Sequence, residues 1–287
     1  MEAQQLEIRE QQKQSWNKFS PGWKKWDTLL MDFLKPMGDA IIEQLKIVDD
    51  DTVLDIAAGT GEPGLDIAGI AKNGAVTGTD LSEEMLLVAE ENAAAKGLKN
   101  YHTKVADVCE LPFEDDTFSA ISCRMGFMFF PDMQLAANEM YRVLKPGGRI
   151  ATSVWAAPDQ NFWITGLMGV IRKYVDVPPP PPGAPGMFRC AKPGLMAEIF
   201  EASGFKNITE QSIKGKGNYV DAHTYWTHMM DCAAPVIALM DKSDEATKQA
   251  IKKDVYELIN SNSTNGQALL DFGATIIYAE KAGKKKV

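Results

Sequence analysis

The ten residues DIAAGTGEPG (55–64) decide the fold of this 287-residue chain. They follow the apolar run VLDIA and precede a helical pattern, and Gly59, Gly61 and Gly64 satisfy the spacing G-x-G-x-x-G. Glycines at such a turn keep it tight and let a ligand approach the backbone closely. The stretch therefore predicts a nucleotide-type ligand at the end of a strand, although the glycines do not say which one.

Outward from this turn, strand and helix patterns alternate between residues 51 and 155. A helix is expected after Ser82, which is a suitable N-cap, and before Gly97; a second one should run from Asp132 to Leu144 and end at the Lys-Pro-Gly-Gly of 145–148. Such alternation is typical of βαβ units with a parallel sheet. The apolar runs are VLDIA, AVTGTD, YHTKVAD, FSAISC and GRIATSVW.

The flanking segments predict helices and two further strands. Residues 1–46 have helical patterns that we expect Pro21 and Gly22 to break, and they are interpreted as an N-terminal lid. After residue 155, a helix over 161–174 and the proline-rich 177–186 precede a short helix that begins at Pro193. The runs FKNITEQSI and GATIIYAEK predict two late strands, with a helical cap over 221–262 between them.

The chain is thus expected to form one structural domain with three parts. Residues 1–46 would be the lid, 47–155 the nucleotide-binding core, and 156–287 the completion of the sheet with helical and proline-rich insertions that cap the substrate.

Composition excludes several classes of function. The formal net charge of -9 disfavours nucleic-acid binding, because an acidic surface repels phosphates. No apolar stretch approaches the ~20 residues of a membrane span, and no signal peptide is recognised, so we expect a cytoplasmic protein without stable membrane insertion. The four cysteines have neither CxxC spacing nor nearby histidines, so no metal site and no disulfide is expected. The oligomeric state stays open.

Carboxylates around the turn indicate the ligand. Asp55 and Glu62 would repel a diphosphate but attract a ligand with a sulfonium and an ammonium group, and S-adenosylmethionine has both. Asp80, at the end of the second strand, can accept from the ribose hydroxyls of either nucleoside cofactor. Asp107 can accept from an adenine amino group while Val108 packs on the ring, and dinucleotide folds do not require an acid there.

At this point the sequence resembles the class I S-adenosylmethionine-dependent methyltransferases, in particular the small-molecule branch that includes enzymes of ubiquinone and menaquinone biosynthesis. The resemblance implies an α/β, Rossmann-like, seven-stranded and mostly parallel sheet whose last strand is antiparallel. It rests on four blocks that occur in order and cover most of residues 51–155: DIAAGTGEPG, VTGTDLSEEML, ADVCELPFEDDTFSAI and EMYRVLKPGGRIATSVW.

The same resemblance assigns the residues that would contact S-adenosylmethionine. Many relatives have glycine where this chain has Ala57, and alanine is a known variant in the quinone branch. Carried over, Ala57, Gly59, Thr60 and Gly61 would line the methionine part, Asp80 would hold the ribose, Leu81 and Met85 would flank the adenosine, Asp107 and Val108 would address the adenine, and Cys123 and Arg124 would lie near the sulfonium.

The acceptor is expected to be a small molecule, because the sequence lacks the motifs of other acceptor classes and is rich in aromatic residues near the predicted site. RMGFMFFPD follows the fourth strand where amide and DNA-amine enzymes have an Asn/Asp-Pro-Pro-aromatic block, and the Pro-Cys pair of cytosine-C5 enzymes is absent from the sequence. The aromatic residues at 127–130 and the tryptophans are either core or the wall of an apolar pocket, and the second interpretation favours an apolar or aromatic acceptor. Among O, C and N nucleophiles, O- or C-methylation is favoured. His223 and His228 are each a packed histidine or a general base, so no catalytic residue is assigned.

Two other functions fit parts of the pattern. The fold can bind S-adenosylmethionine and catalyse a reaction other than methyl transfer. The glycine spacing alone also fits a nicotinamide-dependent oxidoreductase, which Asp55, Glu62 and Asp107 oppose.

Overall fold

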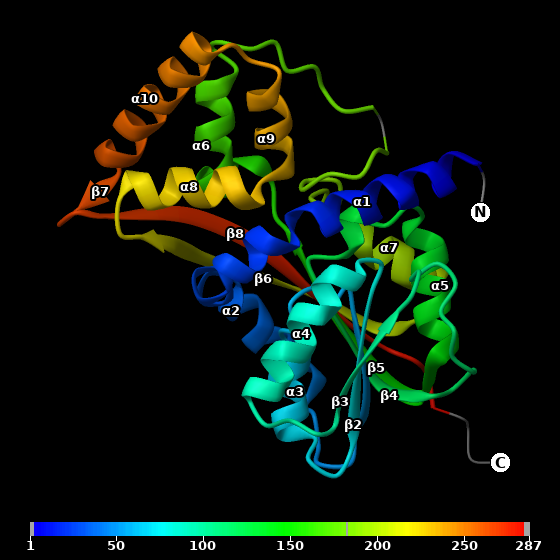
Figure 1. The fold of residues 1–287 in the computed structure, drawn as a ribbon. Helices are drawn as coiled ribbons and strands as arrows, with labels where there is room; N and C mark the ends of the chain where they lie inside the picture. The colour runs from blue at the N-terminus through cyan, green and yellow to red at the C-terminus, as the bar shows by residue number, and fades with distance from the viewer. Residues whose placement is uncertain (1–2, 182, 284–287) are drawn as a thin grey trace.

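A single mixed sheet forms the centre of the molecule, and a computed structural model describes it over residues 3–181 and 183–283. The strand order is β3-β2-β1-β4-β5-β8-β6, and a two-residue strand, β7, pairs with β8 (Figure 1). The strands are β1 (Thr52–Ile56), β2 (Ala75–Asp80), β3 (Tyr101–Val105), β4 (Phe118–Arg124), β5 (Leu144–Trp155), β6 (Lys206–Tyr219), β7 (Ser263–Thr264) and β8 (Gln267–Glu280).

The directions of the strands confirm the predicted fold. Strands β1 to β5 pair in parallel, whereas β8 runs antiparallel to both of its neighbours, β5 and β6. The described sheet has eight strands rather than the predicted seven, and the additional strand is the two-residue β7. Asn265 and Gly266 both adopt positive φ (52° and 81°) and turn the chain from β7 into β8. Two such residues form the tight hairpin turn that matches the twist of its strands.

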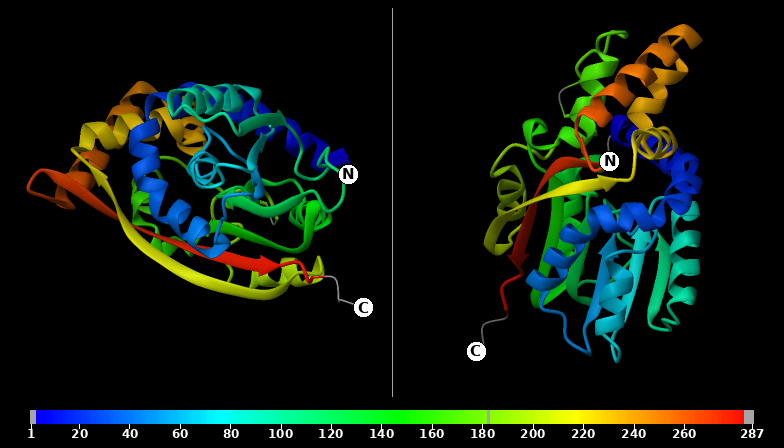
Figure 2. Two further views of the ribbon diagram at one scale, coloured as in Figure 1. Left: turned by 90° about the horizontal axis from the view of Figure 1, so that it is seen from below. Right: turned by 90° about the vertical axis from the view of Figure 1, so that its left-hand side faces the viewer.

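Helices cover both faces of the sheet (Figure 2). On one face lie α2, α3 and α4, and on the other α5 and α7. The helices along the chain are α1 (Ala3–Lys25), α2 (Asp27–Leu45), α3 (Gly64–Ile70), α4 (Glu83–Ala95), α5 (Met133–Val143), α6 (Phe162–Ile171), α7 (Leu195–Ala202), α8 (Ala222–Cys232), α9 (Ala234–Asp241) and α10 (Glu245–Ser261), with short 3-10 turns η1 (Phe127–Phe129) and η2 (Pro158–Gln160).

The two crossover helices begin where their caps predict. Ser82 Oγ accepts from the backbone N–H of Met85 at 3.1 Å, and Asp132 Oδ1 accepts from that of Leu135 at 2.9 Å. Each cap satisfies one of the N–H groups that the first turn of a helix leaves free. Gly97 follows α4 with a φ of +69°, a conformation that favours glycine after a helix end.

Helices α8, α9 and α10 form a cap between β6 and β8, as expected for 221–262, and they stand with α6 beyond one end of the sheet (Figure 1). Within this cap, α10 packs against α6 and α8. Its apolar residues Ile251, Val255 and Ile259 are buried at helical spacing. The described part of the proline-rich segment 177–186 contains neither helix nor strand.

The expected break at Pro21 and Gly22 was wrong, since α1 runs through both residues to Lys25. Proline removes one helical hydrogen bond, which leaves the carbonyl of Asn17 without its usual donor. The hydroxyl of Ser20 donates to that carbonyl at 3.2 Å instead. The helix therefore tolerates Pro21, and the chain changes direction only at Trp26, between α1 and α2 (Figure 1).

Gly22 is needed for a close approach of α1 to α8. A Cβ atom placed on Gly22 would lie 2.3 Å from the carbonyl oxygen of Asp231. Because real Cβ atoms do not come so close to backbone, a side chain here would push the two helices apart.

We expect Gly22→Ala to lower the free energy of unfolding by ~1–3 kcal/mol, the usual cost of overpacking. Denaturant unfolding measures the change. The matched control is Gly169→Ala in α6, where a Cβ has nothing within 4 Å, and it should be neutral or stabilise by up to ~1 kcal/mol. Equal stabilities of the two variants would contradict the close contact.

Candidate functional site

The predicted cofactor residues meet at one edge of the sheet. Ala57 follows β1, Asp80 ends β2, Asp107 follows β3, and Arg124 ends β4. These strands are parallel neighbours, so their carboxyl ends lie side by side. In open α/β sheets, ligands bind at this edge. Helix α1 passes across it (Figure 1).

The glycine loop has one open side and one packed side. Ala57 and Gly59 both have a φ of 54°, and a Cβ on Gly59 would meet nothing within 4 Å. Gly61 lies on the packed side, because a Cβ there would be 2.7 Å from the Leu65 side chain. The loop thus leaves room beside Gly59 and is held against α3 at Gly61.

Asp80 connects this loop to the start of α4. Its Oδ2 accepts from the N–H of Gly59 at 3.0 Å, and its Oδ1 accepts from that of Ser82 at 2.9 Å. Burial raises the pKa of Asp80, while these backbone N–H groups lower it. A carboxylate has about four lone-pair sites, so both oxygens can still accept from a ligand.

Asp55 lies beneath the loop and is fully buried. Its Oδ1 accepts from the Ser122 hydroxyl at 2.6 Å, and its Oδ2 accepts from the N–H of Gly64 at 3.2 Å. Burial raises the pKa of Asp55 to about 7, although Ser122 and the charge of Arg124 oppose the shift. Asp55 therefore fixes the end of the loop to β4 and carries a charge that changes near neutral pH.

The charge of Glu62 is paired with a lysine of the neighbouring chain segment, which the sequence pattern did not indicate. Glu62 forms an ion pair with Lys96 and accepts from the N–H of Asp66 at 3.2 Å. Because Lys96 compensates its charge, the argument that Glu62 repels a diphosphate is corrected. Asp27 provides another carboxylate instead: its Oδ1 accepts from the Thr60 hydroxyl at 3.0 Å.

The positive charge of Arg124 acts on Asp55 and opposes the rise in pKa that burial causes there. Nη2 of Arg124 lies 3.2 Å from the sulfur of Met31, on α2. Burial lowers the pKa of Arg124, and the charges of Asp55, Glu62 and Asp27, in that order, oppose that shift. The strand end therefore contains a compensated cluster rather than carboxylates alone.

Asp107 is engaged by the N-terminal helix. Its Oδ1 accepts from the N–H of Cys109 at 2.8 Å, and its Oδ2 lies 3.4 Å from Nη1 of Arg9. Val108 beside it is buried. An adenine amino group at Asp107 would therefore share or replace the weak contact with Arg9.

Other contacts fasten α1 across the same edge. The Ser82 hydroxyl donates to Oδ1 of Asn17 at 2.6 Å, and Nε2 of Gln5 donates to Oδ2 of Asp132 at 2.8 Å. Arg9, Asn17 and Asp27 were missed by the sequence reasoning. No local motif marks them, because their partners lie far away in the chain.

The remaining predicted residues are mostly buried around the strand ends. Met85 and Cys123 are buried, and Leu81 is partly exposed. Burial raises the pKa of the Cys123 thiol to about 12, so that thiol is neutral at physiological pH. A neutral thiol is a poor nucleophile, which argues against covalent catalysis by Cys123.

Some of the aromatic residues lie in the core, and others lie on α1 or in contact with it. Phe127, Met128 and Phe130 are buried core residues. Trp16 contacts both Trp23 and Phe129, with ring centroids 5.9 and 5.3 Å apart. Trp155 and Trp163 pack instead with Phe33 of α2 inside the core.

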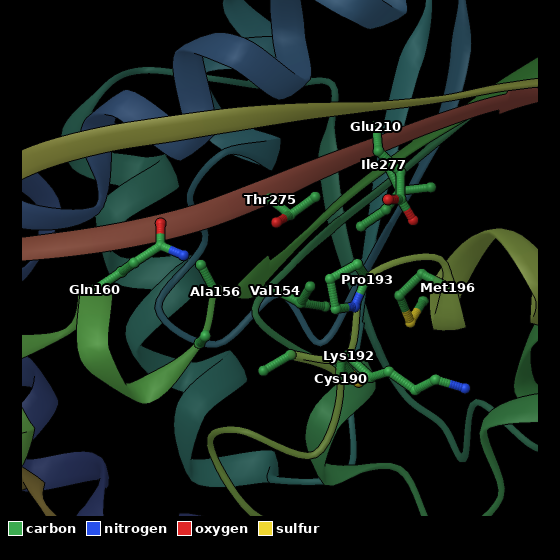
Figure 3. Close-up of a pocket in the computed structure, with 12 residues that line it drawn as sticks. Val154, Ala156, Gln160, Cys190, Lys192, Pro193, Met196, Glu210, Thr275 and Ile277 are labelled. Atoms are coloured by element: carbon green, nitrogen blue, oxygen red, sulfur yellow. The ribbon is translucent and has the colours of Figure 1, made fainter.

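A separate pocket of about 120 Å³ lies between the sheet and the segment 190–196 (Figure 3). Its strand residues alternate with those that contact α2, so the pocket is on the opposite face of the sheet. The predicted cofactor residues are not in its lining, which among the described residues is Val154, Ala156, Ala157, Gln160, Cys190, Ala191, Lys192, Pro193, Met196, Glu210, Thr275 and Ile277.

Residues 3–181 and 183–283 contain neither a candidate metal site nor a candidate membrane span. No group of three or more histidine, cysteine, aspartate or glutamate side chains is arranged to hold a metal ion. No helix within those ranges combines the length and the hydropathy that crossing a membrane needs.

Comparison with known sequences identifies the central region. Residues 53–148 match the family described as a methyltransferase domain, and this range includes the glycine loop, Asp80 and Asp107. An uncharacterised protein of Mycobacterium bovis is 36% identical over 165 residues, which are 55% of this chain and 58% of that protein. The demethylmenaquinone methyltransferase of Thermus thermophilus is 35% identical over 135 residues, 47% of this chain and 51% of the enzyme. The chain thus spans about half the length of the curated relatives it matches.

Comparison with solved structures supports the fold. The crystal structure of the YcgJ protein from Bacillus subtilis superimposes with a TM-score of 0.56 and 21% identity, over 86% of this chain and 98% of that one. The agreement extends the likeness in fold beyond the matched sequence region.

The buried Asp55 generates a prediction about pH. Its folded pKa of about 7 is above the ordinary 3.8, so the folded protein binds a proton more tightly than the unfolded chain. Stability from this group is therefore present below about pH 4 and is lost as the pH rises to about 7. We expect Asp55→Asn to remove that loss, which is on the order of a few kcal/mol.

Denaturant unfolding of wild type and Asp55→Asn between pH 4.5 and 8 tests this expectation in the absence of ligand. The difference in free energy should grow in favour of the variant as the pH rises. Parallel curves for the two proteins would show that Asp55 does not titrate in this range.

Proposed function

We propose that this chain, which carries a methyltransferase domain of the class I S-adenosylmethionine-dependent type over residues 53–148, binds S-adenosylmethionine at the carboxyl edge of its sheet and transfers the methyl group to a small acceptor. An apolar or aromatic acceptor and an oxygen or carbon nucleophile are the favoured choices. The observation that carries the proposal is Asp80, which holds the N–H groups of Gly59 and Ser82 and keeps lone pairs free beside the open side of the glycine loop.

The residues present fit this cofactor. Asp80 can accept from both ribose hydroxyls, which two oxygens of one carboxylate suit. Asp107 can accept from the adenine amino group, with buried Val108 next to it. The space beside Gly59, where a Cβ would meet nothing within 4 Å, admits close contact with the backbone.

The charges near the loop support a cationic ligand. Asp27 contacts Thr60 of the loop, and Asp55 lies directly beneath it. A ligand cation would favour the charged form of Asp55, since a nearby opposite charge lowers the pKa of a carboxyl. A diphosphate in the same place would meet these two acids, and the buried cation Arg124 already interacts with both of them.

The reaction needs positioning more than covalent help. Bound S-adenosylmethionine supplies an activated methyl group on its sulfonium. The chain's contribution is to hold the acceptor in line with that group and to exclude water, and the tryptophans of α1, Trp16 and Trp23, suit the second task. No strong base is required if the acceptor is an acidic phenol or enol.

Asp80→Asn should weaken S-adenosylmethionine binding by ~1.5–3 kcal/mol, roughly 10- to 150-fold in Kd, because charge-assisted hydrogen bonds become neutral ones. Titration calorimetry measures the Kd. Asp66→Asn is the matched control: it makes the same change in charge at an exposed residue of α3 and should leave the Kd within about threefold. Unchanged affinity in Asp80→Asn would refute the ribose assignment.

The lid role of the N-terminal segment is a second prediction. Deleting residues 1–19 removes the contacts of Arg9 and Asn17 with the cofactor edge and should raise the Kd and expose the bound ligand. Asn17→Ala tests the same contact with less risk to folding, since Phe19 stays in the core. Unchanged affinity and turnover in both variants would contradict a lid.

Two measurements separate the proposal from its rivals. Production of S-adenosylhomocysteine during turnover is expected for a methyltransferase and not for a catalyst of another reaction that only binds the cofactor. A thermal shift with S-adenosylmethionine but not with NAD is expected, because only a ligand of the folded state raises the melting temperature.

A further inference from the structure

His228 of α8 carries a buried nitrogen without a hydrogen-bond partner. The residue is 1% exposed, and its Nδ1 lies 3.0 Å from the hydroxyl of Tyr219. Its Nε2 has no partner among the residues that the structure describes. The adjacent Asp231 does not serve it, since Oδ2 of that residue accepts from Lys25 and from Trp26, each at 2.7 Å.

Counting donors and acceptors determines which nitrogen bears the proton. The Tyr219 hydroxyl is buried and needs an acceptor, and Nδ1 of His228 is the one within reach. If Tyr219 donates, the neutral imidazole carries its hydrogen on Nε2, and one buried N–H is left over. The other tautomer would leave both the hydroxyl hydrogen and Nε2 unsatisfied, which costs more. Burial lowers the pKa of His228 to about 4, so the ring is neutral at physiological pH.

A second buried donor lies at the same helix junction. Trp23 Nε1 also has no partner among the described residues. Trp23 and Trp26 are three positions apart at the end of α1, and the Trp26 ring contacts the His228 ring with centroids 5.6 Å apart. Gly22, the residue before Trp23, approaches the backbone of Asp231 so closely that a Cβ on it would lie 2.3 Å from that carbonyl oxygen, which brings this end of α1 onto α8.

The junction adjoins the proposed cofactor edge through short contacts. Asp27, the residue after Trp26, accepts from Thr60 of the glycine loop. On its other side, Trp23 contacts Trp16, which packs on Phe129 just after β4. The two buried N–H groups without partners among the described residues thus belong to a junction of aromatic rings, and residues of that junction contact the glycine loop and the end of β4.

We propose that His228, held by Tyr219, is a specificity-determining residue that donates a hydrogen bond from Nε2 to an oxygen of the methyl acceptor, which is therefore a flat apolar molecule bearing a carbonyl, phenolic or enolic oxygen. This inference rests on the proposed function, because it concerns the acceptor half of that site. Buried N–H groups left unpaired discriminate strongly against an analogue without the oxygen. In this role His228 orients the acceptor and does not take its proton, and Tyr219 is a positioning residue.

Binding of two probes of nearly equal size tests the proposal. In the complex of the full chain with S-adenosylhomocysteine, 2-naphthol is expected to bind at least about 10-fold more tightly than 2-methylnaphthalene, measured by quenching of tryptophan fluorescence. In His228→Phe, which keeps a ring but lacks the donor, the ratio should fall to about threefold or less. His223→Phe is the control, because His223 is exposed on the same helix and contacts Tyr256.

The tautomer gives a second measurement that packing alone would not produce. The chain has three histidines, so ¹⁵N-labelled histidine yields few signals. At pH 7 the His228 ring should be neutral with its hydrogen on Nε2, and 2-naphthol should shift that nitrogen. Tyr219→Phe should remove the preference for this tautomer while S-adenosylmethionine still binds.

The outcomes distinguish this inference from the proposed function. If S-adenosylmethionine binds but 2-naphthol shows no advantage, or if the hydrogen is found on Nδ1, the role of His228 is overturned and the methyltransferase proposal stands. If S-adenosylmethionine fails to bind wild type, the proposed function itself fails. A His228→Phe variant that binds the cofactor with wild-type affinity shows that a lost preference is not due to misfolding.

Discussion

The buried carboxylate of Asp55 is the constraint on which the rest of the site depends. It joins β1 to β4 through Ser122 and fixes the first N–H of α3 through Gly64, so the glycine loop has a defined course between two strands and a helix. A buried acid is tolerated only when its oxygens are hydrogen-bonded. Because Asp55 has those partners and a raised pKa, it serves as an anchor and also as a charge that responds to a ligand above it.

Around this anchor, the edge of the sheet is closed by the N-terminal helix. Contacts from α1 reach three separate strand ends or helix starts, at Asp107, Ser82 and Asp132. All three contacts come from one continuous helix, so α1 lies across the whole edge as one element. Its far end meets α8, where Gly22 allows the backbones to touch. The cofactor edge and the cap with His228 are thereby connected through one element.

The carboxylates that favour a cationic ligand are not the pair that the sequence pattern indicated. Glu62, which the sequence pattern placed at the helix start, is neutralised by Lys96, whereas Asp27 takes a position beside Thr60 that no spacing rule indicates. The two acids next to the glycine loop are therefore Asp55, which the sequence predicted, and Asp27, which it did not. The buried Arg124 balances part of their charge, which keeps the loop stable before a ligand arrives.

The sequence by itself determined the sheet core, its strand-end residues and the caps at Ser82 and Asp132, because these depend on local periodicity and on short-range hydrogen bonds along the chain. Only the tertiary structure decided that α1 continues through Pro21, that Glu62 pairs with Lys96, and that Nε2 of His228, whose ring contacts Trp26, has no partner within residues 3–181 and 183–283. Each of these depends on partners far away in sequence: a hydroxyl that replaces a lost donor, a lysine on another helix, and an aromatic ring brought in by a helix from the other end of the chain. Such pairings are set by packing, and packing leaves no periodic trace in the residues that it joins.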